Sequence, residues 1–240
     1  MSGYRHIAAI LLACALWHGA AAQEEPRSRP FNDAQLWLSL GTEFKPFRKK
    51  AGHLGQARFF RNLRATGELE WRLNDNATHL KQFNIDAGLR YPLADFLRAG
   101  AQYRYSVRDS FHPNVQRIDL QLWAKWRPGR FKLEHRAEYE HSFTDVRKYR
   151  TLLRNKLSAT YNIPNWKLDP TVSAEAFTAL HYTGTRLVGM RYDIGTELGL
   201  GKKKKSTMAL TLRYDREMNV KAPKYAWILV AAMEHDFRKK

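Results

Sequence analysis

The sequence predicts an all-β fold, an antiparallel up-and-down transmembrane β-barrel of about twelve strands, with about ten as the fallback. Three observations support this prediction. Apolar and polar residues alternate with a period of two through most of the chain, as in strands, where successive side chains point to opposite faces. Turn-forming segments separate the alternating stretches. Aromatic residues gather at the ends of the apolar faces, whereas aliphatic residues occupy the middles.

Residues 1–22 have the pattern of a secretory signal peptide. A basic start at Arg5 precedes an apolar run, and the small residues Ala20–Ala22 precede Gln23. The apolar run is too short to span a bilayer stably. Lipoprotein cleavage at Cys14 is the competing interpretation. Cleavage after residue 22 would remove the single cysteine, so we expect an exported chain without a disulfide framework or thiol chemistry.

The remaining chain divides into an N-terminal arm at residues 23–33, a barrel at residues 34–237 and a basic tail at residues 238–240. After residue 22 no run approaches the roughly 18 apolar residues of a transmembrane helix, and the mean hydropathy is -0.58. Neither observation excludes a membrane barrel, because alternating strands leave only a weak hydropathy signal.

The alternation recurs in eleven stretches, which we expect to be strands. They span residues 36–44, 63–73, 83–91, 97–107, 118–126, 131–140, 153–163, 166–176, 188–200, 208–214 and 225–237. Short turns such as "YPLADF" and "WRPGRF" lie between longer polar links such as "NDNATHLKQ" and "FTALHYTGTR", a pattern typical of an up-and-down meander. Because bacterial single-chain barrels have an even number of strands, we place a short additional strand around residues 53–60.

Alternation alone does not show which face is inside. In the stretch "IDLQLWAKW", one face carries Ile118 and Leu120 and the other carries Asp119 and Gln121. A soluble, lipocalin-like periplasmic barrel would bury the apolar face. We favour the reverse, because the chain is predicted to be exported and because about eight strands make a barrel that side chains fill, whereas more strands leave a polar lumen.

The aromatic residues of the apolar faces also favour a lipid-facing exterior, because amphipathic rings prefer the headgroup level of a bilayer. We expect two aromatic girdles that contain Trp71, Tyr91, Tyr105, Trp126, Phe131, Tyr139, Trp166, Tyr214 and Phe237. The nearly terminal Phe237 also resembles the aromatic-ended last strand that outer-membrane barrel assembly machinery recognises. We therefore expect the bacterial cell outer membrane as the location, with the lipid bilayer and this machinery as partners.

Charged residues of both signs share the polar faces. The candidates for the lumen or a pore are Arg98, Arg104, Arg136, Arg154, Glu134 and Glu138. One interpretation is a cross-strand ionic network that packs the lumen, since buried charges persist when they are paired. The other is a narrow passage for small polar or anionic solutes. The two signs nearly balance, which favours packing.

The chain carries a formal net charge of +18, and the excess lies in basic runs such as "FRKK", "VRKYR" and "GKKKK". We expect these runs at the membrane rim, where they meet anionic headgroups or lipopolysaccharide phosphates. Binding of nucleic acid is not expected, because no recognition motif accompanies the charge.

We do not expect an enzyme. The alternative is a lipid-acting hydrolase with a rim Ser/His site, for which His141 and Ser142 are the adjacent nucleophile–base pair. Sequence neighbours on a strand do not face each other, so this pair does not fit the geometry that nucleophilic catalysis needs. We expect no catalytic, cofactor-binding or metal-binding residues, because metal clusters and phosphate-binding glycine loops are missing from the sequence.

The phrases "LWLSLGTEF", "LRAGAQYRYSV", "RFKLEHRAEYE" and "RKYRTLLRNKLSATY" resemble the exported, β-barrel-like proteins of domain-of-unknown-function family 2490 from Gram-negative bacteria. The segment Leu133–Arg136, followed by Tyr149-Arg150 and Leu153-Arg154, carries the resemblance best, and a basic insertion at residues 45–58 departs from it. The resemblance covers residues 33–237. It implies a barrel and an outer-membrane address, and it brings no catalytic residues and no substrate.

Overall fold

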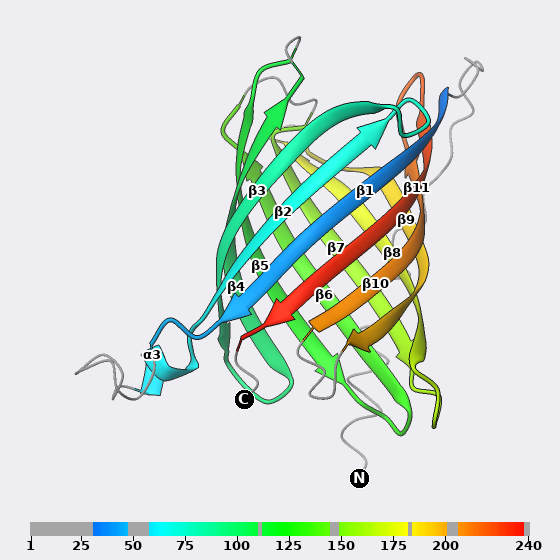
Figure 1. Cartoon of the computed structure of the whole chain (residues 1–240). Coiled ribbons are helices and arrows are strands. Elements are labelled where there is room, and N and C mark those ends of the chain that lie inside the picture. Colours follow the sequence, from blue (N-terminus) through cyan, green and yellow to red (C-terminus); the bar gives the residue numbers. More distant parts are fainter. Residues whose placement is uncertain are drawn as a thin grey trace.

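Eleven β-strands close into one barrel in which strand order follows sequence order (Figure 1). The structure is a computed structural model that describes residues 31–47, 58–109, 112–144, 149–181, 184–200 and 206–237. Each strand is antiparallel to the next along the chain, so the fold is the predicted up-and-down meander. The predicted all-β fold class is confirmed.

The strands are eleven to seventeen residues long. Their bounds are β1 Phe31–Phe44, β2 Arg64–Asn74, β3 His79–Pro92, β4 Leu97–Arg108, β5 Val115–Trp126, β6 Phe131–Ser142, β7 Thr151–Tyr161, β8 Leu168–His181, β9 Gly184–Leu200, β10 Ser206–Glu217 and β11 Lys224–Asp236, and the helix is α3 Arg58–Asn62.

The closure of the barrel is parallel. When strands alternate in direction, an odd number makes the first and the last run the same way, and β1 pairs with β11 in parallel from Phe31↔Lys224 to Glu43↔Asp236. The count in the described chain is close to the predicted twelve but lacks the short additional strand expected around residues 53–60. Residues 58–60 begin helix α3 instead, and residues 53–57 lie outside the described residues.

Only some of the predicted segment boundaries fall within the described residues. Strand β1 begins at Phe31, inside the predicted arm at residues 23–33. The predicted signal peptide at residues 1–22, the rest of the arm and the basic tail at residues 238–240 lie outside the described residues. The described strands run from residue 31 to residue 236, and the predicted barrel bounds are residues 34–237.

Charged side chains line the inside of the barrel and apolar side chains cover the outside. The carboxylate residues Glu138 and Glu175 are each 2% exposed, whereas the outward Ile194 is 60% and Leu120 is 51% exposed. This arrangement is the reverse of a soluble barrel, which buries its apolar face. The apolar strand faces therefore look outward, as the aromatic residues at the strand ends predict.

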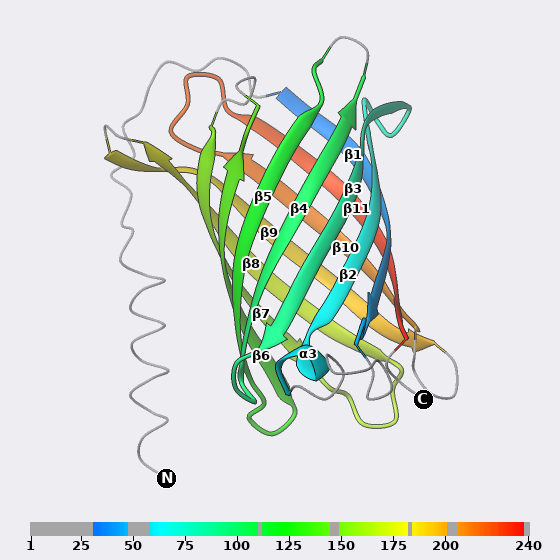
Figure 2. The same cartoon turned by 90° about the vertical axis from the view of Figure 1, so that its left-hand side faces the viewer.

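The two ends of the barrel differ less in loop length than the sequence predicts. At the α3 end, where β11 also finishes (Figures 1 and 2), turns at residues 93–96 and 127–130 join strands. We call the opposite end the far rim. There a tight turn at residues 75–78 joins β2 to β3 in place of the predicted long link. Asp75, Asn76 and Ala77 adopt left-handed backbone angles, which allow the chain to reverse within so few residues. Strands β8 and β9 likewise extend into the predicted link at residues 177–186.

Helix α3 packs against the barrel wall at the α3 end of the barrel (Figure 2). The ring of Phe59 stacks on Tyr91 of β3 with a centroid distance of 4.8 Å, and Phe60 contacts Phe47 at 5.1 Å. In the described part of the chain, no helix has the length and apolar character needed to cross a membrane.

Candidate functional site in the barrel lumen

The lumen contains a cavity of about 690 Å³ that side chains from both halves of the barrel line. Its wall carries eleven Arg or Lys residues and seven Asp or Glu residues. Four aromatic residues also line it: Trp37, Trp123 and Phe177 from strands, and Tyr149 from the link between β6 and β7. Because strands alternate their side chains, these residues occupy the polar faces, opposite to the apolar residues that look outward.

A belt of ion pairs occupies one side of the cavity, contributed by strands β5 to β9. We call it the ionic belt, and it consists of Arg117, Asp119, Arg136, Glu138, Glu140, Arg154, Glu175 and Arg191. Glu175 is its most connected carboxylate, lying 2.7 Å from Arg136, 2.9 Å from Arg154 and 3.5 Å from Arg191. These contacts join four strands through side chains, in addition to the backbone ladders.

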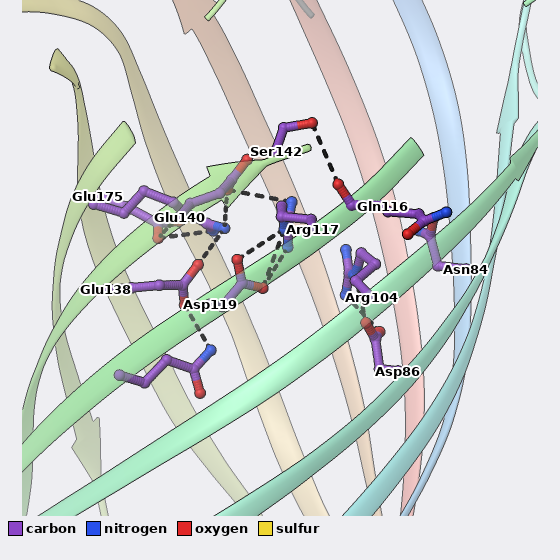
Figure 3. A network of polar contacts seen from close by, with 12 residues as sticks. Asn84, Asp86, Arg104, Gln116, Arg117, Asp119, Glu138, Glu140, Ser142 and Glu175 are labelled. Carbon is purple, nitrogen blue, oxygen red and sulfur yellow. Dashed lines mark hydrogen bonds and ion pairs between the residues drawn. The ribbon is translucent and has the colours of Figure 1, made fainter. Parts of the chain in front are cut away.

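Three carboxylates of the belt converge, as Figure 3 shows. Single oxygen atoms of Asp119, Glu138 and Glu140 all lie within 4.8 Å of one another, a spacing that could suit a cation. However, Arg117 lies 2.8 Å from Asp119 and 3.2 Å from Glu140, and Arg154 lies 2.6 Å from Glu138. The guanidinium groups already supply the positive charge, so these residues do not fit a metal site.

A second network lies on strands β2 to β4. Arg104 forms a two-pronged contact with Asp86 at 2.6 and 2.7 Å. Glu70 accepts hydrogen bonds from Arg72 at 2.7 Å and from Asn84 at 2.5 Å. The paired fork of Arg and carboxylate fixes side-chain geometry as well as charge.

Trp37 is an inward aromatic residue that the sequence analysis did not single out. It is 5% exposed, and the Arg72 guanidinium lies 3.8 Å from its ring centroid. Arg213 and Arg191 lie near the same ring, at 5.1 and 5.4 Å. Its position between Leu36 and Leu38, on the opposite parity, was the available signal.

The predicted lumen residues do not form one continuous line. Arg104, Arg136, Arg154 and Glu138 line the cavity and belong to the two networks. Glu134 instead pairs with Lys125 at 2.6 Å, toward the α3 end. Arg98 is half-buried near the same end, and it makes no ion pair with the described residues.

A second, smaller cavity of about 440 Å³ opens at the α3 end. Four basic residues and two acidic residues line it, namely Arg127, Arg130, Lys132, Lys167, Asp169 and Glu197. The short turns between β5 and β6 and between β7 and β8 supply Arg127, Arg130 and Lys167, and strands β6, β8 and β9 supply the other three. The basic character of the chain therefore extends to this mouth of the barrel.

The predicted girdle residues lie within three residues of strand ends and form two groups. At the far rim they are Trp71, Tyr105, Tyr139 and Tyr214, and at the α3 end they are Tyr91, Trp126, Phe131, Trp166 and Phe237. Several are strongly exposed, including Trp166 at 61% and Phe237 at 57%. Trp227, which was not predicted, joins the far-rim group through a ring contact with Tyr214 at 4.8 Å.

The adjacent pair considered for hydrolysis does not form a nucleophile–base contact. Ser142 is buried and its hydroxyl lies 3.4 Å from the carbonyl oxygen of Gln116 (Figure 3). The imidazole of His141 instead contacts the hydroxyl of Thr151 at 3.0 Å. Opposite strand faces separate the two side chains, as period-two geometry requires.

Another Ser–His contact lies on the outer face at the α3 end. The Ser206 hydroxyl lies 2.8 Å from Nδ1 of His235, its cross-strand neighbour. Among residues with described positions, no carboxylate contacts His235. A hydroxyl and an imidazole without a third group to orient the ring are insufficient for a catalytic triad.

Comparison with known proteins gives a family and a distant structural similarity. The family model for DUF2490, a protein of unknown function, matches residues 34–222. A solved structure of a bacterial polysaccharide outer membrane secretin is similar at 12% identity and a TM-score of 0.47, over 69% of this chain and 62% of that one. The chain thus spans less than two thirds of that protein. No curated protein matches the sequence.

Proposed function

This chain belongs to the DUF2490 family of proteins of unknown function, and we propose that it is an integral β-barrel of the bacterial outer membrane with an envelope-structural role. In this proposal, residues 1–22 direct export, and the ionic belt packs the lumen. The protein acts through its barrel and not through an active site.

The observation that carries the proposal is the inverted distribution of polarity. Leu40, Ile194 and Leu229 are 52%, 60% and 45% exposed on the outside, while Asp119 and Glu138 are 1% and 2% exposed inside. Exposed apolar strand faces are unfavourable in water and favourable against lipid tails. A closed barrel also pairs its backbone polar groups from strand to strand, which a spanning structure requires.

The aromatic groups at both strand ends support the same placement. Tyr and Trp rings are enriched where hydrocarbon meets headgroups. The basic residues Arg130 and Lys167 lie beside Trp166 at the α3 end, where anionic headgroups would meet them.

A narrow passage for small anionic solutes is the second candidate function. The lumen cavity supports it, because eleven basic residues face seven acidic ones. The ionic belt opposes it, because its side chains occupy the lumen between β5 and β9. A packed belt predicts a low conductance.

Fractionation of expressing cells, a heat-modifiability gel and single-channel recording in a planar bilayer test both candidates. We expect recovery in the outer membrane, a mobility shift on heating, and little conductance. The double variant Arg154→Ser/Glu175→Ser removes the centre of the belt and should raise the conductance. Recovery as a soluble periplasmic protein would contradict the membrane placement, and high conductance of the unmodified protein would favour the passage.

The non-enzymatic part of the proposal has its own test. Purified barrel is incubated with phospholipid vesicles and released fatty acid is measured. We expect none above a heat-denatured control. Release that His141→Ala or His235→Ala abolishes would show a hydrolase and contradict this part.

A further inference from the structure

The cations that line the lumen cavity fall into two groups. Nine of the eleven form an ion pair with a carboxylate within 4.0 Å, including Arg72, Arg104 and Arg213. Lys81 and Arg108 are the two that form no ion pair with any residue whose position is described. They lie on adjacent strands toward the far rim, so the unpaired charge is concentrated in one place.

A β-bulge turns Lys81 into the lumen. The β2–β3 register shifts between Arg72 and Leu73, so that Arg72 faces Gln82 and Leu73 faces Leu80. Lys81 is the extra residue, and both it and Gln82 line the cavity, while Leu80 is 49% exposed outside. Bulges commonly re-aim a side chain near a functional site. Here the bulge adds a cation that strict alternation would have placed on the apolar face.

Cross-strand pairing brings further groups to the same position. Arg72, Gln82 and Arg108 form a row across β2, β3 and β4, because each faces the next in the ladder. Directly opposed side chains in a sheet have Cβ atoms about 5 Å apart. We call Arg72, Lys81 and Arg108 the cationic corner.

Glu70 pairs with Arg72 of the corner at 2.7 Å, and the other carboxylates near the corner contact groups other than Lys81 and Arg108. Asp33 is a charged neighbour of Lys81, but its carboxylate accepts a hydrogen bond from Gln35 at 2.7 Å. Glu217 lines the cavity and accepts a hydrogen bond from the backbone N–H of Lys224 at 3.0 Å. Neither carboxylate comes within 4.0 Å of the Lys81 ammonium or the Arg108 guanidinium.

We propose that the cationic corner binds a small oxyanion, such as the phosphate group of a soluble solute, at the far-rim mouth of the lumen cavity. An ammonium and a guanidinium supply charge-assisted donors, and the planar guanidinium can bind two oxygens of a phosphate or carboxylate at once. The amide nitrogen of Gln82 donates one hydrogen bond to Asn84 Oδ1 at 3.0 Å, and its second N–H is a neutral donor beside the two cations. Both cations are half-buried, so an ion there is less screened than at the open surface.

A solute fits this site better than a lipid headgroup does. Lys81, Gln82 and Arg108 face the lumen cavity, and the barrel wall separates them from the surrounding lipid. A phosphate on lipid would have to cross the rim to reach them. The inference deepens the proposed function, since it depends on a lumen that is open to water at the far rim.

Calorimetric titration of the folded barrel with inorganic phosphate, in uncharged detergent at low ionic strength, tests the site. We expect saturable binding that Lys81→Gln weakens by about tenfold or more, the effect of one lost charge-assisted contact. The matched control Lys167→Gln removes the same charge at the α3 end and should change the affinity by less than about twofold. If Lys81→Gln does not fold, Arg108→Gln replaces it, with the same expectation.

Each outcome decides for or against the site. Absence of saturable binding, or equal weakening by Lys81→Gln and Lys167→Gln, would overturn it. A second titration with phosphatidylglycerol in the micelles separates the two sources of phosphate, because competition by the lipid would overturn the assignment to a solute. Heat modifiability is recorded on the same samples. If the unmodified protein keeps its mobility shift but binds no phosphate, the site alone is refuted, whereas loss of outer-membrane recovery refutes the proposed function.

Discussion

The ionic belt and the cationic corner lie in the same lumen, yet the belt's charged side chains are paired with each other, whereas Lys81 and Arg108 of the corner are not paired with any described residue. In the belt, Glu175 contacts three arginines and Arg154 contacts three carboxylates. In the corner, Lys81 and Arg108 contact none among the described residues. The belt uses charge to hold strands together, while the corner leaves charge available for something that enters from outside.

Burial explains why the two regions can coexist. Glu138 and Glu175 are each 2% exposed, and charges removed from water to that degree are tolerated only when they are paired. Lys81 and Arg108 are half-buried at the mouth of the cavity, so water can solvate them. Depth in the lumen thus separates charges that stabilise the fold from charges that can bind a ligand.

The largest expected effect is the loss of the central carboxylate of the belt. Glu175→Gln leaves Arg136, Arg154 and Arg191 with one fewer partner in a buried site. We expect the free energy of unfolding to fall by about 3–5 kcal/mol, as when one partner of a buried pair is removed. Urea unfolding in detergent micelles, followed by tryptophan fluorescence, measures the change.

A matched control uses the same substitution in a pair that is only half-buried. Glu134 and Lys125 pair at 2.6 Å with side chains 25% and 26% exposed, so Glu134→Gln should lower the free energy of unfolding by less than about 1 kcal/mol. Equal effects of the two variants would show that the belt does not stabilise the barrel more than a rim pair does.

A charge on the outward face gives the next largest effect, and it tests whether this face contacts lipid. Leu210 is 46% exposed, and it faces outward between Tyr214 and the α3 end of β10. Leu210→Arg should destabilise the barrel in lipid vesicles by about 2–4 kcal/mol, while Ser206→Arg near the strand end should change it by about 0–1 kcal/mol. If Leu210→Arg leaves stability in vesicles unchanged, this face does not contact lipid.

The strands and their faces follow from the sequence because period-two alternation is a direct consequence of strand geometry. The alternation of Ile118, Asp119, Leu120 and Gln121 predicts which side chains meet in the lumen, and the structure places them accordingly. Alternation did not show which strand face looks into the lumen, and that assignment also needed the aromatic residues at the strand ends. The number of strands was harder to predict, because an even count is a rule of known bacterial barrels and not a consequence of this pattern.

The cationic corner could not be predicted by the same reasoning. Lys81 lies in "NDNATHLKQ", a polar stretch that suggests a loop, and the bulge beside it breaks the parity on which the faces were assigned. Arg108 lies at the end of its strand, just beyond the stretch that alternates. A bulge depends on the register between two strands, which is a tertiary property, so one strand's pattern does not reveal it.

The smallest effect is expected for a substitution that adds a carboxylate to the cationic corner, so that its cations become paired as they are in the ionic belt. Lys81→Glu supplies a carboxylate next to Arg72 and Arg108, and it removes a like charge from their vicinity. We expect the free energy of unfolding to rise by about 1 kcal/mol, the modest value typical of partly exposed pairs. Phosphate binding should disappear in the same variant, because the new carboxylate occupies the donors that an oxyanion would use. Lys81→Gln, which removes the like charge without adding a partner, separates relief of repulsion from pairing. Should Lys81→Glu destabilise the barrel or retain phosphate affinity, the corner would not be a site of unpaired positive charge, and its contrast with the belt would fail.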